Sequence, residues 1–183
     1  VSTMEAAFRR QMSDPCFPVY WDRLGARFVF TRLETDRSHE INGFGVRVMV
    51  QSHHGGSFGY RFERDGKVLV YSTDTENKQE NEAQTEAAVA FFQDADLVVY
   101  DAMYSLADMV TVKEDWGHSS NIVGADLCLR AGVRHYCMFH HEPAYDDDMI
   151  HNNLKETRRY AEIVGEGRSL RISSAFDDMV IEL

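Results

Sequence analysis

Ionisable side chains follow four apolar runs of this 183-residue sequence, at the points where the runs end. The segments concerned are Ser52-His53-His54-Gly55-Gly56, Ser72-Thr73-Asp74, Asp101 and His140-His141-Glu142-Pro143. Imidazole and carboxylate groups are the ligands that Zn²⁺, Mn²⁺ and Fe prefer, and ligands from separate strands fix the coordination geometry. A carboxylate can also bridge two ions about 3.5–4 Å apart, which would hold a hydroxide for attack on a phosphoryl or acyl centre. The pattern therefore predicts a divalent-metal site.

A plainer interpretation exists for each of these residues alone. A histidine beside a strand is more often a surface or capping residue, and an aspartate such as Asp74 commonly caps a following helix. His140 would then be a structural imidazole that donates to a backbone carbonyl. Hydrophobic patterning does not require four consecutive apolar runs to end in such groups, however, and this recurrence favours the metal site.

The elements that would position these residues change type along the chain. The first third is β-rich, with strands expected at residues 26–33, 45–51, 58–64 and 67–72. From Asn81 the apolar period is that of a helix to about Gln93, and strand 97–100 follows. The rest is expected to form helix 119–131, strand 136–139, helix 147–164 and closing strands 170–173 and 179–183. The alternation predicts an α/β layer whose strand ends carry the site.

Composition limits the class of function. The 30 acidic residues outnumber the 19 basic ones, and the net charge of −11 disfavours a sequence-independent nucleic-acid coat. The longest apolar run, residues 87–92, is far shorter than the roughly 20 residues that cross a bilayer. The three cysteines form no C-x-x-C spacing and suggest no disulfide framework. We therefore expect a cytoplasmic protein that does not enter the membrane.

Four segments of the chain resemble the metallo-β-lactamase fold hydrolases, in the branch near ribonuclease Z and related phosphodiesterases. In order they are residues 53–61, with His53 six residues before the Gly59-Tyr60-Arg61 strand; 71–76, with Asp74; 101–104 together with 117–120; and 138–143, with His140. They extend over about residues 52–143. The resemblance implies an α/β fold of the metallo-β-lactamase αββα sandwich type.

The resemblance also implies a role for five residues. His53 and His140 would each complete the coordination of one metal and Asp74 would bridge both, the metals being two Zn²⁺ ions, with Mn or Fe as alternatives. Asp101 and His118 would form a catalytic pair, in which the carboxylate fixes the tautomer and the other ring nitrogen donates to phosphate or protonates the leaving oxygen. The alternative for residues 117–120 is a loop that supplies the N-cap of the next helix.

The sequence departs from the family at one motif. The signature H-x-H-x-D-H, which supplies further metal ligands, occurs nowhere in the chain. Its place would lie upstream of residue 1. We therefore expect residues 1–183 to form a single domain that is the C-terminal part of a longer chain and carries half of the site.

Three functions follow, in order of preference. The first is hydrolysis of a small-molecule or nucleotide-like phosphodiester by a hydroxide bound to two metal ions. The second is hydrolysis of a thioester or lactone, because the same centre can stabilise a tetrahedral oxyanion. The third is a truncated, non-catalytic domain that binds a partner or forms a homodimer through a bare sheet edge.

Overall fold

The computed structural model describes residues 2–78, 80–111 and 115–183. The chain divides into two compact units, one up to Glu34 and one from Thr35 to Leu183. The first unit contains helix α1 (Ser2–Gln11) and a short 3₁₀ helix, η1 (Trp21–Arg23). The second contains all the strands.

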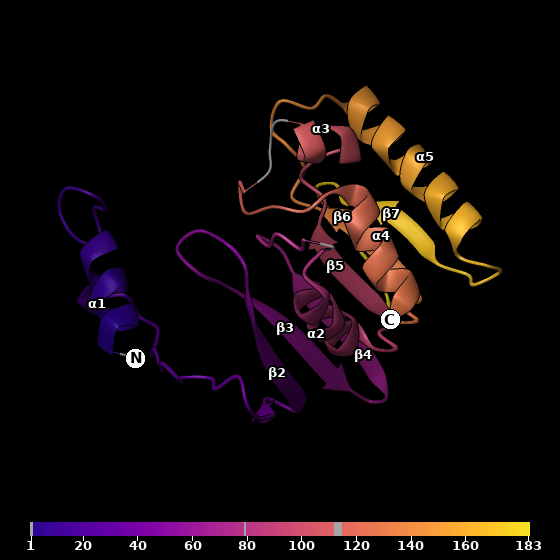
Figure 1. The fold of residues 1–183 in the computed structure, drawn as a ribbon. Helices are drawn as coiled ribbons and strands as arrows, with labels where there is room; N and C mark the ends of the chain where they lie inside the picture. Colours follow the sequence, from indigo (N-terminus) through magenta and orange to yellow (C-terminus); the bar gives the residue numbers. More distant parts are fainter. Residues whose placement is uncertain (1, 79, 112–114) are drawn as a thin grey trace. The chain divides into compact units, whose positions relative to one another are not determined.

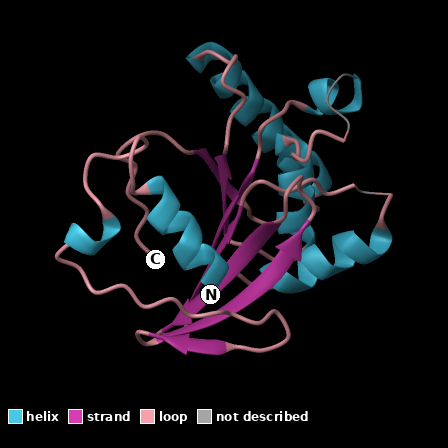
Figure 2. Cartoon of the chain, turned by 90° about the vertical axis from the view of Figure 1, so that its left-hand side faces the viewer, coloured by secondary structure: helices cyan, strands magenta, loops and turns pink. Residues whose placement is uncertain are grey.

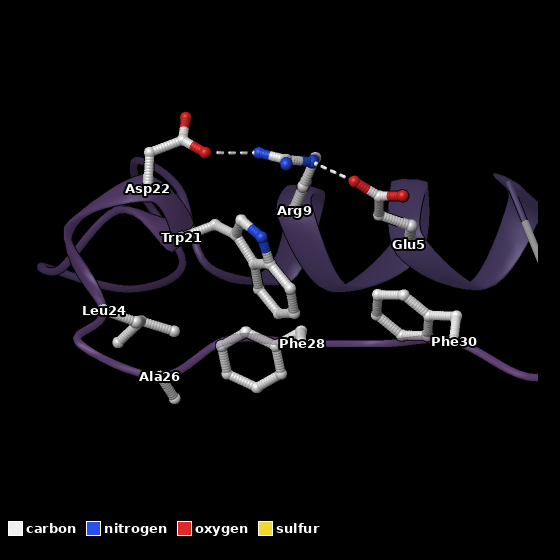
Figure 3. Close-up of a pocket in the computed structure, with 8 residues that line it drawn as sticks. All are labelled: Glu5, Arg9, Trp21, Asp22, Leu24, Ala26, Phe28 and Phe30. Carbon is white, nitrogen blue, oxygen red and sulfur yellow. Dashed lines mark hydrogen bonds and ion pairs between the residues drawn. The ribbon is translucent and has the colours of Figure 1, made fainter.

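The first unit packs around Trp21. Figure 3 shows the indole between the Arg9 guanidinium and Phe28, with ring distances of 5.7 Å from Arg9 Cζ and 4.2 Å between centroids. Arg9 also forms ion pairs with Glu5 at 3.0 Å and Asp22 at 2.6 Å. A cation over an indole face is an attractive arrangement, and the two carboxylates hold that cation in place.

The strand expected at residues 26–33 was a wrong prediction, because no strand of the described chain includes these residues. Phe28 and Phe30 instead lie with their ring centroids 4.2 and 6.0 Å from that of Trp21. An extended segment that packs alternate rings on one indole has the same period of two as a strand in a sheet. The alternation of apolar residues at 26–33 therefore reflects packing on Trp21 and not pairing in a sheet.

The second unit is built on one seven-stranded sheet in which the strands neighbour one another in chain order. The strands are β1 (His39–Ile41), β2 (Phe44–Gln51), β3 (Ser57–Arg64), β4 (Lys67–Ser72), β5 (Leu97–Asp101), β6 (His135–Phe139) and β7 (Arg171–Ser174). Pairs from β1 to β4 are antiparallel and pairs from β4 to β7 are parallel. Strands β2, β4, β5 and β6 therefore run in one direction, and their carboxyl ends meet at one edge of the sheet (Figure 1).

Helices cover one face of this sheet. They are α2 (Glu82–Phe92), α3 (Leu106–Thr111), α4 (Asn121–Arg130) and α5 (Asp147–Val164), of which α2, α4 and α5 lie over the strands (Figures 1 and 2). Their apolar sides enclose strand residues such as Val70, Val98 and Met138, all fully buried. Asn81, Ser120 and Asp146 cap the three long helices by accepting a hydrogen bond from a backbone N–H three residues on. The predicted α/β layer is confirmed.

The other face of the sheet is also apolar, and we call it the open face. The pairing register places on it Val46, Val48, Val50, Phe58, Tyr60, Phe62, Leu69, Tyr71, Leu97, Val99, Cys137 and Phe139. Three of these side chains are clearly accessible, Val50 being 64%, Phe58 49% and Tyr71 40% exposed, whereas Val46, Val48, Leu97 and Cys137 are at most 5% exposed. Parallel strands normally bury both faces, so this surface is suited to contact with further protein.

The closing strand expected at residues 179–183 was also a wrong prediction. No strand of the described chain includes these residues, and Val180 and Leu183 are 83% and 47% exposed. Apolar composition alone favoured the strand, but a strand also needs a backbone partner. In the part of the chain that the structure describes, no helix has both the length and the apolarity to cross a membrane.

Candidate metal centre

Two of the predicted metal ligands occupy sharp turns just after parallel strands. Asp74 follows β4 with a φ of 55°, and His140 follows β6 with a φ of 61°. Residues other than glycine seldom adopt this left-handed conformation, and each such residue costs about 1–3 kcal/mol. Unfavourable backbone of this kind is frequent at functional sites, where the surrounding structure holds a side chain in a required position.

These turns bring imidazole and carboxylate groups together at the carboxyl edge of the sheet. One donor atom from each of His53, Asp74 and His118 lies within 4.8 Å of the others. His140 adjoins the same group, with its Nε2 3.7 Å from Asp74 Oδ1 and its ring stacked on His118 at a centroid distance of 4.9 Å. The structure therefore groups His53, Asp74 and His118, and places His140 beside Asp74 and His118 at the margin of this group.

Hydrogen bonds fix which nitrogen of two of these imidazoles faces the cluster. The Nδ1 of His53 lies 2.8 Å from the carbonyl of His54, and the Nδ1 of His118 lies 2.8 Å from Asp101 Oδ2. A carbonyl or carboxylate oxygen can only accept, so each Nδ1 carries the hydrogen. In the neutral ring, each Nε2 then keeps its lone pair for a ligand or a metal ion.

Asp101 is the hydrogen-bond partner that orients His118. It is fully buried at the end of β5 and accepts backbone N–H bonds from Thr75, Met103 and Ser119 at 3.1–3.3 Å, besides the bond from His118. These donors stabilise a carboxylate that burial would otherwise disfavour. The hydrogen bond to Asp101 raises the pKa of His118 above its ordinary value, since it favours the imidazolium form.

A second carboxylate, that of Glu76, ties the loop after β4 to the loop that carries His118. Its Oε1 accepts from the backbone N–H of Asp115 at 2.9 Å and its Oε2 from that of Gly117 at 3.3 Å. Glu76 is only 7% exposed. His54 binds the same loop, with its Nε2 2.9 Å from the Asp115 carbonyl. The sequence contains no signal that distinguishes Glu76 from an ordinary surface glutamate, and our sequence prediction missed it.

The structure contradicts the plainer interpretation of Asp74 and supports that of residues 117–120. The next helix, α2, begins at Glu82 with Asn81 as its N-cap, so Asp74 is not a helix cap; its Oδ2 accepts instead from the Thr73 hydroxyl at 2.9 Å. Ser120 does cap α4, as the alternative for residues 117–120 expected, while the neighbouring His118 reaches the cluster. His141 points elsewhere, with its Nε2 2.9 Å from Ser174 Oγ.

The donor set suits a divalent metal ion. Two imidazoles with a free Nε2 and one carboxylate, contributed by separate loops, match the nitrogen and oxygen ligands of Zn²⁺ and related ions. The carboxylate–imidazole bond from Asp101 is the support that a metal-binding or phosphate-binding histidine needs for a fixed orientation. The grouping of His118 with His53 and Asp74 is a feature that spacing in the sequence did not predict.

Comparisons with known proteins agree with this fold. The family model described as a beta-lactamase superfamily domain matches residues 14–141. A ribonuclease Z from Brevibacillus brevis is 32% identical over 83 residues, which are 45% of this chain and 24% of that protein. A ribonuclease Z from Trichodesmium erythraeum is 35% identical over 96 residues, 51% of this chain and 27% of that protein. The matched region is thus about a quarter of these curated relatives.

Several solved structures share this fold at lower sequence identity. Unliganded yeast PDE1 superposes with a TM-score of 0.66 at 14% identity, over 94% of this chain and 55% of that one. The metallo-beta-lactamase fold protein YhfI of Bacillus subtilis gives 0.61 at 15% identity, over 79% and 52%. The short form of human tRNase Z gives 0.54 at 20% identity, over 79% and 45%. The predicted metallo-β-lactamase fold is confirmed.

Proposed function

The chain belongs to the beta-lactamase superfamily, and on this premise we propose that it forms part of a metal-dependent phosphodiester hydrolase. The observation that carries the proposal is the convergence of His53, Asp74, His118 and His140 at one edge of the sheet, backed by the buried Asp101. Histidine and carboxylate groups from separate loops, with a buried carboxylate behind one imidazole, form a site for metal-assisted hydrolysis.

Each residue has a defined task in this proposal. His53, Asp74 and His140 would hold the divalent metal ions, and Asp74, whose Oδ1 lies 3.7 Å from His140 Nε2, would be the ligand shared between them. Divalent ions bound there would activate water and neutralise the charge that develops on the phosphoryl oxygens. In its imidazolium form, His118 keeps one proton on Nδ1 against Asp101 and carries a second on Nε2, which it donates to a phosphate oxygen or transfers to the leaving oxygen.

The phosphodiester substrate is favoured by the His118–Asp101 pair and by the two curated relatives named ribonuclease Z. The net charge of −11 repels a large folded polyanion, so we propose a small or cyclic nucleotide-like diester. The chain supplies fewer ligands than two ions need and lacks the H-x-H-x-D-H motif. We propose that residues 1–183 are one domain, the C-terminal part of a longer hydrolase, whose remaining ligands come from outside these residues.

Metal binding tests this proposal directly. The protein is dialysed against trace Zn²⁺ or Mn²⁺, and metal per chain is measured by plasma mass spectrometry together with hydrolysis of bis(p-nitrophenyl) phosphate. His140→Ala should reduce both bound metal and hydrolysis. His151→Ala is the matched control, because His151 lies exposed on α5 and, among the described residues, its hydrogen bond is to the Asp147 carbonyl of its own helix.

The outcomes separate the parts of the proposal. About two ions per chain would mean that the site is completed by this chain or a second copy. Metal that binds without hydrolysis would mean that the missing catalytic groups lie elsewhere. Metal content that His140→Ala and His151→Ala leave equally unchanged would contradict the assignment of His140 as a ligand.

A further inference from the structure

A cavity of about 410 Å³ lies beside the candidate metal centre, between the ends of β2 and β4 and the first turns of α2. This volume is within the about 300–1,000 Å³ range of small-molecule sites. Its lining includes Gln51, Ser52, Thr75, Asn77, Gln84 and Ala87. The proposed chemistry at the metal centre uses none of these side chains.

The cavity contains hydrogen-bonding groups that the protein leaves unused. Asn77 and Thr75 are 3% and 6% exposed, respectively. Asn77 Oδ1 accepts from Thr85 and its backbone N–H binds Ser119, but within the described residues neither Asn77 Nδ2 nor Thr75 Oγ1 has a partner. Neither atom is among the fully occluded unpaired polar atoms, and both belong to residues that line the cavity. A nearly buried polar group without a partner is costly unless a ligand or water satisfies it.

The chemistry of the lining excludes several classes of ligand. No charged side chain lines the cavity in the described chain, which argues against a second phosphate and against a cationic ligand. Met49, Ala87 and Ala88 provide apolar wall, while amides and hydroxyls provide neutral donors and acceptors. A flat, uncharged heterocycle with hydrogen-bonding edges fits both features. The amides of Gln51 and Gln84 are engaged within the protein, so the nearly buried side-chain amide left for such a ligand is that of Asn77, a residue type that pairs well with nucleobase edges.

The position of the cavity connects it to the proposed substrate. Ser52 of the lining directly precedes His53, and Thr75 of the lining directly follows Asp74. The Cα atoms of consecutive residues lie about 3.8 Å apart, so the lining adjoins the candidate ligands. We propose that this cavity binds the uncharged nucleobase of a nucleotide whose phosphodiester lies at the metal centre. The inference rests on the proposed function for the identity of the substrate, but base binding itself requires neither metal nor phosphate.

The test uses nucleosides, which carry a base but no phosphate. Uridine and adenosine are titrated into the ¹⁵N-labelled protein in the presence of a chelator, and ribose is titrated as the probe without a base. The expected result is a saturable shift of the Thr75, Asn77 and Gln84 amide signals with at least one nucleoside and none with ribose. Ala87→Leu, on an exposed helical position that lines the cavity, should weaken binding by about tenfold or more by filling it.

Ala90→Leu is the matched control, because Ala90 is also exposed on α2 but does not line the cavity. It should leave nucleoside affinity unchanged. The inference is overturned if neither nucleoside shifts these amides, if ribose shifts them equally, or if Ala87→Leu and Ala90→Leu bind alike. Hydrolysis of bis(p-nitrophenyl) phosphate, which has no nucleobase, reports on the proposed function separately, so each can fail without the other.

Discussion

A single buried carboxylate organises the site at the scale of residues. Asp101 accepts hydrogen bonds from three backbone amides and from His118, so its charge is compensated before any ligand arrives. Groups held in this way need no rearrangement when charge develops nearby, which is what makes a polar site effective. The imidazole of His118 therefore has one orientation, and its role can be separated from that of the neighbouring ligands.

His118→Ala distinguishes a proton-transfer role from a metal-binding role. We expect the variant to keep its bound metal and to lose about 10²–10⁴-fold of its hydrolytic rate on bis(p-nitrophenyl) phosphate, because only the donor to the leaving oxygen is removed. Metal content and rate are measured on the same preparation, with His151→Ala as the control. Loss of metal together with activity would instead identify His118 as a third ligand beside His53 and Asp74, a role that their spacing allows.

His135 provides a prediction for the pH dependence of stability. Burial, and then the charge of Arg171, lowers the pKa of His135 below its ordinary value of 6.5, and its Nε2 lies 2.8 Å from Ser173 Oγ. Below pH 6.5 the unfolded chain therefore binds more protons at this residue than the folded one. The free energy of unfolding must fall as the pH drops from 6.5 to the lowered pKa, by at most about 1.4 kcal/mol per pH unit.

His135→Gln should remove this contribution. Urea unfolding is measured with a chelator from about pH 5 to pH 8, and the difference between wild type and variant is plotted against pH. The difference should decline on the acid side of pH 6.5 and be flat above it. His151→Gln, on an exposed helix surface, should show no such trend. A parallel pH profile for wild type and His135→Gln would rule out the burial argument.

At the scale of elements, the site depends on loops that are held to one another rather than on strands alone. Glu76 links the loop after β4 to the backbone of Asp115 and Gly117, next to His118. Ser119 adds to the link, since its hydroxyl donates to the Thr75 carbonyl at 2.7 Å and accepts from the Asn77 N–H at 3.0 Å. The two loops therefore form one hydrogen-bonded layer beneath the candidate ligands.

Glu76→Gln tests how much this link contributes. The amide nitrogen that replaces one carboxylate oxygen cannot accept from a backbone N–H, so one buried donor loses its partner at a cost of about 1–3 kcal/mol. We expect faster hydrogen exchange at the amides of Asp115 and Gly117, measured by NMR. Glu86→Gln is the control, because Glu86 pairs with Arg130 at the surface, where such pairs contribute little. Equal exchange in the two variants would show that the loops are ordered by other contacts.

The sequence predicted most elements of the sheet layer and, through the family resemblance, the contact between His118 and Asp101, but not the other links between the elements. Strand 67–72 and helix 147–164 agree with β4 and α5 at both ends, because period and capping residues mark them locally. The Asn42-Gly43 turn between β1 and β2, with both φ values positive, is a hairpin signal that we overlooked. Glu76 accepts from backbone amides 39 and 41 residues away, and Asp101 accepts from those of Thr75 and Ser119, 26 and 18 residues away; no local pattern in the sequence reveals such pairs.

At the scale of the whole molecule, the second unit has a sheet with two apolar faces and helices on only one of them. The twelve apolar residues of the open face are uncharged, and the same register places charged residues such as Arg64, Lys67 and Asp101 at the strand ends of that face, in a chain whose net charge is −11. An uncharged patch on an acidic protein is the surface on which two copies meet with least repulsion. The face is therefore a better dimerisation surface than the bare sheet edge that the sequence led us to expect.

We predict that the chain forms a homodimer through the open face. A twofold axis places the same patch of each copy against the other, so one substitution acts twice at the interface. Phe58→Glu, at a side chain that is 49% exposed, should bury two like charges in contact and shift the protein to a monomer. Light scattering over about a hundredfold range of concentration measures the change. Phe176→Glu, the same replacement at a 70% exposed position outside the open face, should leave the dimer intact. A wild-type monomer at every concentration, or equal effects of the two substitutions, would refute this interface, because a dimer held elsewhere has no reason to respond to Phe58 alone.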